Sequence, residues 1–272
     1  MRHYSSKIAL IKNGRGVYSL DPSIGCSSGL KENTKGCYND CYAAKSAKLY
    51  GYDFSKTVYR DFDSKKHLHE IIRQISLIKL DFIRMGTSGD PSENWEHTMK
   101  ILRVIKSCNK QVVIITKHWN NLTLENLNEL SNMNIVFNTS VSSLDNIEIL
   151  ENTLFQYEKI KGFCKSILRV VTCDFNKENE TGLYFHNLQE TLLNNENVVE
   201  TVLRVNKNNP LLKDEIINVS KTKFLGKNAL VSKRNKKTYL GNCKNCLEMC
   251  GLNKNDGNKK YNDTILHQLT LF

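Results

Sequence analysis

The sequence predicts an α/β fold around a parallel sheet, which would form either a barrel, complete or partial, or an open doubly wound sheet. Short apolar runs bounded by polar turns recur through the middle of the chain, as in parallel strands covered on both faces. Stretches with apolar residues at helical spacing separate these runs. About five such alternations indicate right-handed crossovers. The 272 residues, 40% of them hydrophobic, suffice for one α/β barrel or two small domains.

The expected strands and helices alternate in order along the chain. The apolar runs that predict strands are 81–85, 112–116, 135–141, 167–172 and 198–205. The amphipathic stretches that predict helices are 65–79, 95–105, 121–132, 146–161 and 182–195. Ser92 is the expected N-cap of the second helix and Asp145 that of the fourth, because both side chains can accept a bond from the first helical turn.

The pattern divides the chain into four parts. Residues 1–63 are irregular and rich in Gly and Ser, and are expected to form an N-terminal cap. The alternating core spans 64–220. A basic, Cys-rich extension follows at 221–262, and residues 263–272 form a tail.

The charge balance favours a polyanionic partner. Lys and Arg number 39 and Asp and Glu 28, so the net charge is 39 − 28 = +11. Such a charge is typical of nucleic-acid binding, although the codon bias of an AT-rich genome would also enrich Lys. No apolar run is long enough for a membrane span, and the N-terminus lacks a signal pattern. The sequence therefore predicts a soluble, cytoplasmic protein without membrane contact.

Six of the nine cysteines fall into two groups of three, one near each end of the chain. An odd count without a secretion signal argues against a disulfide framework, and clustered thiols in a reducing compartment usually hold metal. The first group is Cys26, Cys37 and Cys41. Three thiolates can hold a [4Fe–4S] cluster and leave one iron free for a small molecule. A zinc site, which would need a fourth ligand, and unliganded cysteines are the alternatives.

The residues around this group carry a resemblance to a known family. Gly25-Cys26, followed later by Cys37-Tyr-Asn-Asp-Cys41-Tyr42-Ala43, resembles the cysteine motif of radical S-adenosylmethionine (SAM) enzymes. It resembles more closely the short phage-associated branch typified by gene product 88. The usual Cys-x3-Cys-x2-Cys pattern is broken at Ala44, so the third ligand would come from Cys26 upstream.

The resemblance implies a partial (β/α)6 TIM-like barrel with an irregular N-terminal cluster loop and a Cys-rich C-terminal extension. It implies that the Gly-rich stretch after an early strand faces the methionine part of SAM, with further contacts from later strand ends. The implied cofactor-binding residues are Gly86, Thr87, Ser88, Gly89, Asp90, Asn138, Ser140 and Arg169. The candidate catalytic residues are Asp90, Lys117 and Cys173. In a barrel these residues would gather at the carboxyl ends of the strands.

The implied activity is reductive cleavage of SAM to a 5′-deoxyadenosyl radical, with an electron from a flavodoxin- or ferredoxin-type reductant. Together with the charge, the resemblance predicts modification or repair of nucleic acid, most simply DNA, or of a nucleotide in a phage or mobile-element setting. Radical chemistry on a protein or small metabolite is one alternative. A non-enzymatic, metal-stabilised DNA-binding or clamp-binding protein is another.

The second cysteine group is Cys243-x2-Cys246-x3-Cys250. It predicts either a second [4Fe–4S] cluster or a structural zinc. Candidate fourth ligands are Cys164, Cys173, His186 and His267, unless substrate supplies it. A metal-stabilised C-terminal lid is the simpler reading, and ligation of the SAM cluster by this group remains a further alternative.

The last five residues, Gln268-Leu-Thr-Leu-Phe272, resemble the bacterial sliding-clamp binding motif. Two Leu and a Phe can anchor in an apolar groove, and Gln can form a polar bond. The alternative is that the tail packs on its own core. If functional, the tail and the basic stretch 221–237 would both bring the protein to DNA, with Phe224 and Tyr239 available to stack on bases.

Overall fold

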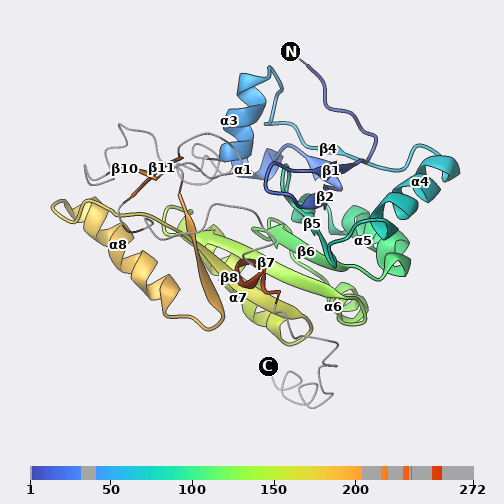
Figure 1. The fold of residues 1–272 in the computed structure, drawn as a ribbon. Helices are drawn as coiled ribbons and strands as arrows, with labels where there is room; N and C mark the ends of the chain where they lie inside the picture. The colour runs from blue at the N-terminus through green and yellow to red at the C-terminus, as the bar shows by residue number, and fades with distance from the viewer. Residues whose placement is uncertain are drawn as a thin grey trace.

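The computed structural model describes residues 2–31, 41–203 and 247–252, together with Arg234 and the backbone of two short strands at 216–219 and 229–232. Its centre is a seven-stranded sheet in the order β1-β2-β5-β6-β7-β8-β9 (Figure 1). The strands are β1 (Leu10–Lys12), β2 (Tyr18–Leu20), β5 (Phe82–Met85), β6 (Gln111–Thr116), β7 (Ile135–Ser142), β8 (Lys165–Thr172) and β9 (Val198–Val202).

The pairing within this sheet is mostly parallel. β1 and β2 form an antiparallel pair. Every other neighbouring pair, from β2–β5 to β8–β9, is parallel. The chain is therefore an α/β protein, and all five strands expected from the apolar runs are present as β5 to β9. Two smaller antiparallel pairs lie outside this sheet, namely β3 (Ser23–Ile24) with β4 (Val58–Tyr59) and β10 (Ile216–Val219) with β11 (Ala229–Ser232).

The five expected helices are also present. They are α4 (Lys65–Ser76), α5 (Trp95–Ile105), α6 (Leu124–Ser131), α7 (Ile147–Lys161) and α8 (Glu180–Leu193). Two of the predicted caps are wrong. Asn94 caps α5 and Asn146 caps α7, each through a side-chain oxygen that accepts a backbone N–H of the first turn. Ser92 and Asp145 instead bond to other parts of the chain, which is why neither serves as a cap.

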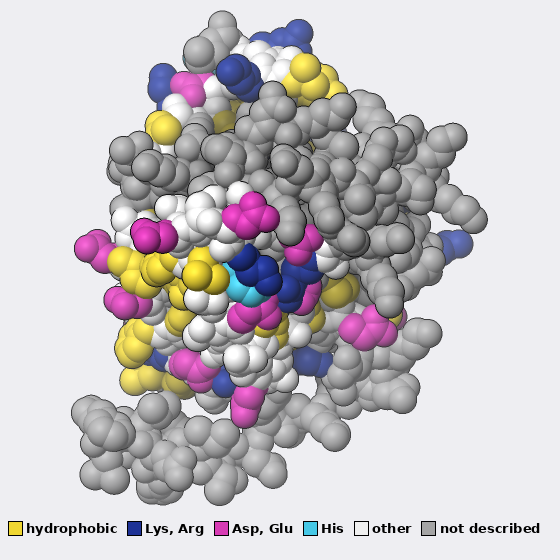
Figure 2. Space-filling view, turned by 90° about the vertical axis from the view of Figure 1, so that its left-hand side faces the viewer, with side chains coloured by type: hydrophobic (Ala, Val, Ile, Leu, Met, Phe, Trp, Pro, Cys, Tyr) yellow, Lys and Arg dark blue, Asp and Glu magenta, His cyan; other side chains and the backbone are white. Residues whose placement is uncertain are grey.

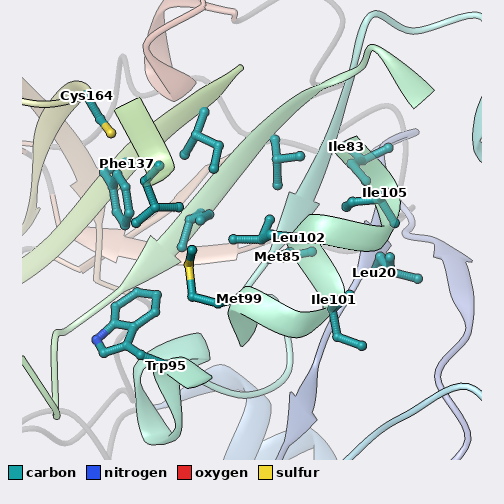
Figure 3. Close-up of a cluster of buried hydrophobic side chains, with 14 of the residues drawn as sticks. Leu20, Ile83, Met85, Trp95, Met99, Ile101, Leu102, Ile105, Phe137 and Cys164 are labelled. Carbon is teal, nitrogen blue, oxygen red and sulfur yellow. The ribbon is translucent and has the colours of Figure 1, made fainter. Parts of the chain in front are cut away.

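One face of the sheet packs against the helices and is called the outer face here. Its strand residues Ile83, Met85, Ile114 and Phe137 form one apolar cluster with α4, α5 and α6 (Figure 3). Farther along the sheet, Leu168 and Val170 of β8 pack against α7 and α8. Alternate residues of each strand therefore point toward the helices, as the pleat of a strand requires.

The opposite face, called the inner face, is covered near its centre by residues 247–252. This segment contains the short helix η5 (Glu248–Cys250), drawn in red across the middle strands in Figure 1. Its buried side chains pack against strand residues that alternate with those of the outer face, namely Phe82, Val113 and Val136. The C-terminal cysteine segment thus belongs to the core of the sheet.

The N-terminal part contributes to the same sheet. β1 and β2 both fall within residues 1–63, which were expected to form a cap only. Two short helices, α1 (Ser27–Lys31) and α3 (Tyr42–Leu49), follow the first and third cysteines of the N-terminal group. Among the described residues, no helix has the length and apolar character that crossing a bilayer requires.

Candidate functional site

A Gly-rich loop, residues 86–91, leaves the carboxyl end of β5 and is held by a buried carboxylate. Asp21 accepts hydrogen bonds from the backbone N–H of Gly86 at 2.9 Å and of Thr87 at 3.1 Å, and also from the Thr87 hydroxyl. Gly86 has φ +86°, and a Cβ there would lie 2.0 Å from the carbonyl oxygen of Ile115. Only glycine fits this position. Burial raises the pKa of Asp21, and its hydrogen bonds oppose that shift.

Asp90 joins this loop to the end of β6. Its Oδ1 accepts from the Thr116 hydroxyl at 2.6 Å and from the Ser92 hydroxyl at 2.7 Å. Its Oδ2 accepts from the backbone N–H of Lys117 at 2.7 Å. Burial raises the pKa of Asp90, and these bonds lower it. Asp90 was expected to contact SAM, but its carboxylate already has protein donors on both oxygens, so the geometry favours a positioning role.

The two described cysteines of the N-terminal group lie in segments that touch the same loop. The residue before Cys26, Gly25, donates its N–H to the carbonyl of Ser88 at 3.0 Å and forms a β-bridge with Gly89. The residue after Cys41, Tyr42, donates its hydroxyl to the carbonyl of Thr87. Cys26 and Cys41 are both partly exposed free thiols. Cys37 lies outside the described residues.

Glu93 fixes the chain that follows Cys26. Its carboxylate accepts from the backbone N–H of Ser28 at 2.9 Å and from the hydroxyls of Ser27 at 3.0 Å and Ser28 at 3.1 Å. Glu93 lies in the short helix η1 (Pro91–Glu93), directly after the Gly-rich loop. The sequence gives no local signal for this contact, because the partners are about 65 residues apart.

Lys117 forms a buried ion pair at the end of β6. Its Nζ lies 2.6 Å from Oδ2 of Asp145 and 3.3 Å from the carbonyl oxygen of Ser140. Asp145 also accepts the backbone N–H of Ser142. The candidate catalytic Lys117 and the expected SAM contact Ser140 are therefore neighbours. Asp145 completes this group, although the sequence suggested only a helix cap.

His118 follows directly but contacts the outer face. Its ring lies beside Trp95 and Phe137, and its Nε2 is 3.0 Å from the hydroxyl of Thr139. Burial lowers the pKa of His118 to about 3, so the ring is neutral at physiological pH. It is a core residue of the helix layer.

Asn138 and Arg169, two expected SAM contacts, instead touch the C-terminal segment. The Asn138 amide donates to the carbonyl of Cys250 at 3.1 Å, and Arg169 Nη2 donates to the carbonyl of Met249 at 2.6 Å. Neither has a recorded contact with the Gly-rich loop. The predicted cofactor residues therefore divide between two places, the carboxyl end of β5 and the middle of the inner face.

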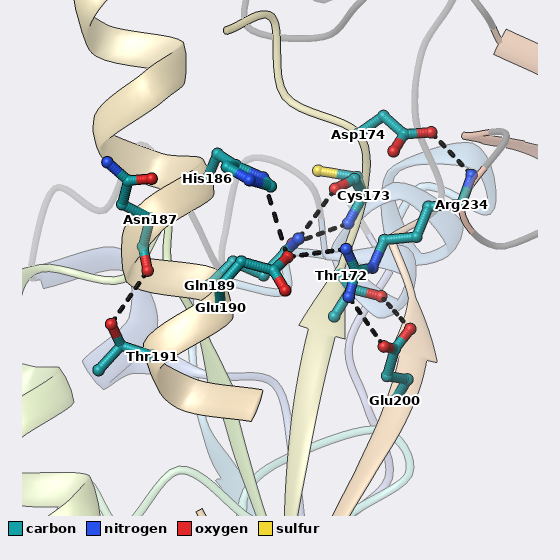
Figure 4. A network of polar contacts seen from close by, with 10 residues as sticks. All are labelled: Thr172, Cys173, Asp174, His186, Asn187, Gln189, Glu190, Thr191, Glu200 and Arg234. Carbon is teal, nitrogen blue, oxygen red and sulfur yellow. Dashed lines mark hydrogen bonds and ion pairs between the residues drawn. The ribbon is translucent and has the colours of Figure 1, made fainter. Parts of the chain in front are cut away.

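Cys173, the third candidate catalytic residue, is 1% exposed and packs with Phe175 and Leu203. Gln189 of α8 clamps its backbone with two bonds of 3.0 and 3.1 Å (Figure 4). Beside it, Arg234 binds Glu190 and Glu200 through its guanidinium. Figure 2 shows the molecular face on this side, where basic and acidic side chains adjoin a histidine, with hydrophobic side chains next to them. The described part of this face is thus mixed in charge.

The described residues contain no group of three potential metal ligands. This observation does not test either cysteine group, because Cys37, Cys243 and Cys246 lie outside them. The tail at 263–272 and most of the basic extension lie outside them too.

Comparison with models of known families, with curated proteins and with solved structures finds no match to this chain.

Proposed function

We propose that this chain is a radical SAM enzyme whose [4Fe–4S] cluster is held by Cys26, Cys37 and Cys41. The observation that carries the proposal is the contact between the cysteine segments and the Gly-rich loop. Gly25 and Tyr42, the neighbours of Cys26 and Cys41, both hydrogen-bond to backbone carbonyls of that loop. Parallel α/β folds build their sites at the carboxyl ends of strands, where this loop begins.

A partial barrel is the fold that we propose for this enzyme. The order from β5 to β9 follows the chain in one direction, whereas a doubly wound sheet reverses its order. The helices α4 to α8 contribute to apolar clusters on the outer face. Right-handed crossovers that always advance in one direction put all helices on one face, as around a barrel. These two features support a barrel-like curvature.

The donor chemistry fits the proposed cluster. Cys26 and Cys41 are free and partly exposed, so both thiols are accessible for metal ligation. When bound, such a cluster supplies an open iron for the amino and carboxylate groups of SAM and an electron for cleaving the sulfonium bond. The chain's own contribution is positioning. Asp21 holds the start of the Gly-rich loop, Asp90 ties its end to β6, and Glu93 fixes the segment after Cys26.

The test is anaerobic iron and sulfide analysis with EPR of the reduced full chain. We expect about four irons per chain from the N-terminal group and an EPR signal that shifts when SAM is added. Cys41→Ala should abolish the SAM-dependent shift. Cys108→Ser is the matched control, since Cys108 lies at the end of α5, outside both groups, and should leave the signal unchanged. Stoichiometric zinc without iron after reconstitution, or no formation of 5′-deoxyadenosine, would overturn the proposal.

Nucleic acid is the substrate class that we propose, on the strength of the +11 net charge. The mixed charge around α8 means that this proposal rests on the basic stretch 221–237, outside the described residues. Binding to a labelled DNA duplex should weaken steeply as salt rises, because phosphate contacts release counterions. Weak binding with no salt dependence would instead favour the protein or metabolite alternative.

Clamp binding by Gln268–Phe272 remains a separate proposal. Its test is binding of the full chain to a purified bacterial sliding clamp, with Leu271→Ala and Phe272→Ala as the disrupting pair. Thr270→Ala is the control, because that position tolerates variation in the motif. Equal binding by all variants would contradict the proposal.

A further inference from the structure

The inner face of the sheet carries polar side chains that converge on the C-terminal cysteine segment. Arg84 comes from β5, Asn138 from β7 and Arg169 from β8. All three contact residues 249–250, more than 75 positions later in the chain. Parallel sheets are normally apolar on both faces, so this polar group is out of pattern for a purely structural surface.

The backbone of the segment is held in a single position. Asn138 and Arg169 bond to the carbonyls of Cys250 and Met249. Gly251 follows with φ +70°, and a Cβ there would lie 2.8 Å from Val136 Cγ1 and 3.0 Å from Ile167 Cγ2. The chain therefore lies directly on the strands, and Cys250 is 1% exposed.

The sulfur of Cys250 faces a cation. Nη2 of Arg84 lies 2.6 Å from Cys250 Sγ, and the Arg84 side chain is itself buried. A guanidinium stays charged in proteins and bonds most strongly to an anionic acceptor. Cys164 is the contrasting case, because it is buried in apolar surroundings and burial raises its pKa to about 12. The setting of Cys250 favours a thiolate, which is the form that ligates metal.

Asn138 supplies an independent observation. Its side chain is 0% exposed, and its Oδ1 has no hydrogen-bond partner among the described residues. Its Nδ2 bonds to the carbonyl of Cys250, so the acceptor is carried by the group that holds this cysteine. Buried acceptors are normally satisfied, and a bound group or its water would supply the missing donor.

We propose that Cys250 is a thiolate ligand of a thiophilic metal centre on the inner face, with Arg84 and Asn138 as its supporting residues. The centre is distinct from the cluster proposed at the N-terminal group. Metal binding forms a metal–sulfur bond to an existing thiolate, with no change in oxidation state. Arg84 orients the sulfur and balances its charge, and partners of this kind tune affinity as ligand-supporting groups do in other metal sites.

The test is cobalt(II) titration of the full chain, read by the sulfur-to-cobalt charge-transfer absorption. Cys41→Ala serves as the background, because it disables the N-terminal group and makes failure there distinguishable. In this background, adding Cys250→Ser should weaken cobalt affinity at least about ten-fold and reduce the charge-transfer intensity per bound cobalt. Adding Cys164→Ser, the matched buried control, should change neither value.

Arg84→Gln keeps the proposal falsifiable if Cys250→Ser does not fold. It retains a donor but removes the charge, so cobalt affinity should fall about ten-fold while circular dichroism stays unchanged. Unaltered cobalt spectra in both folded variants would overturn the proposal. Elemental analysis of the Cys41→Ala protein then distinguishes the native centre. Zinc alone indicates a zinc site, iron with sulfide indicates a cluster, and neither metal under anaerobic purification counts against the site.

Discussion

The two faces of the sheet are built from the same strands but differ in chemistry. On the outer face, residues such as Ile83, Ile114 and Phe137 pack against helices, and the ionisable groups there are kept neutral by burial. On the inner face, Arg84, Asn138 and Arg169 alternate with apolar residues and contact residues 249–250. Burying polar groups costs free energy unless they are paired, so they indicate a function that an apolar surface would not serve.

This difference identifies the outer face as scaffold and the inner face, with the loop at the end of β5, as the place where chemistry is concentrated. The helix layer provides hydrophobic stabilisation. The inner face instead depends on a small number of contacts that join distant parts of the chain. Four substitutions test this comparison, beginning with the largest effect.

Truncating the outer core should have the largest effect on stability. Phe137→Ala removes a fully buried ring between β7 and the helices, and should lower the free energy of unfolding by about 3–5 kcal/mol. Phe155→Ala on α7 is the control, because Phe155 is exposed and should cost within about 0.5 kcal/mol. Urea denaturation measures both. Similar losses in the two variants would contradict the division into faces.

The buried His118 predicts acid sensitivity. Its pKa is about 3 in the folded state against 6.5 ordinarily, so the unfolded chain binds the proton first as pH falls. The stabilising contribution is present above pH 6.5 and is lost as pH falls toward 3, amounting to about 3 kcal/mol by pH 4. His118→Gln should flatten this part of the profile. His69→Gln, an exposed position on α4, should leave it unaltered.

On the inner face, Gly251→Ala should cost about 1–3 kcal/mol, because the new methyl group overlaps Val136 and Ile167 and φ is positive. Gly162→Ala is the matched control, since a Cβ there meets nothing closer than 3.5 Å and φ is −71°. Thermal unfolding of the two variants compares them directly. A tolerated Gly251→Ala would mean that the segment does not lie on the strands.

The smallest effect is expected from a charged contact in the helix layer. Arg103 of α5 binds Glu129 of α6 through two bonds, but both side chains are partly exposed. Arg103→Ala should cost about 0.2–1 kcal/mol, and the loss should shrink at high salt. A larger, salt-independent loss would show that charge, rather than apolar packing, joins these helices.

Much of the fold follows from local patterns in the sequence. The strands β5 to β9 and helices α4 to α8 all lie where apolar runs and helical periodicity predict them, because each run is set by which face must be buried. The caps were harder to predict. Ser92 and Asp145 are good capping residues, but tertiary partners use their side chains, so Asn94 and Asn146 cap the helices instead.

The candidate site was predicted less completely. The Gly-rich loop and the cysteines of the N-terminal group are recognisable from residue type and spacing alone. Asp21 and Glu93 had no such signal, because the residues that they hold lie 65 or more positions away. Asn138 and Arg169 were correctly identified as strand residues of interest, but their contacts with residues 249–250 were not foreseen.

The sequence by itself determined the α/β alternation, the order of the elements and the two clusters of cysteines, because these depend on hydrophobic period and on residue type within a short window. Only the tertiary structure decided which face each cysteine meets. It brings the segments of Cys26 and Cys41 to the loop at the end of β5 and Cys250 to Arg84 on the inner face. The physical reason is that contacts across long sequence separations depend on how the strands and helices pack, which no local pattern encodes.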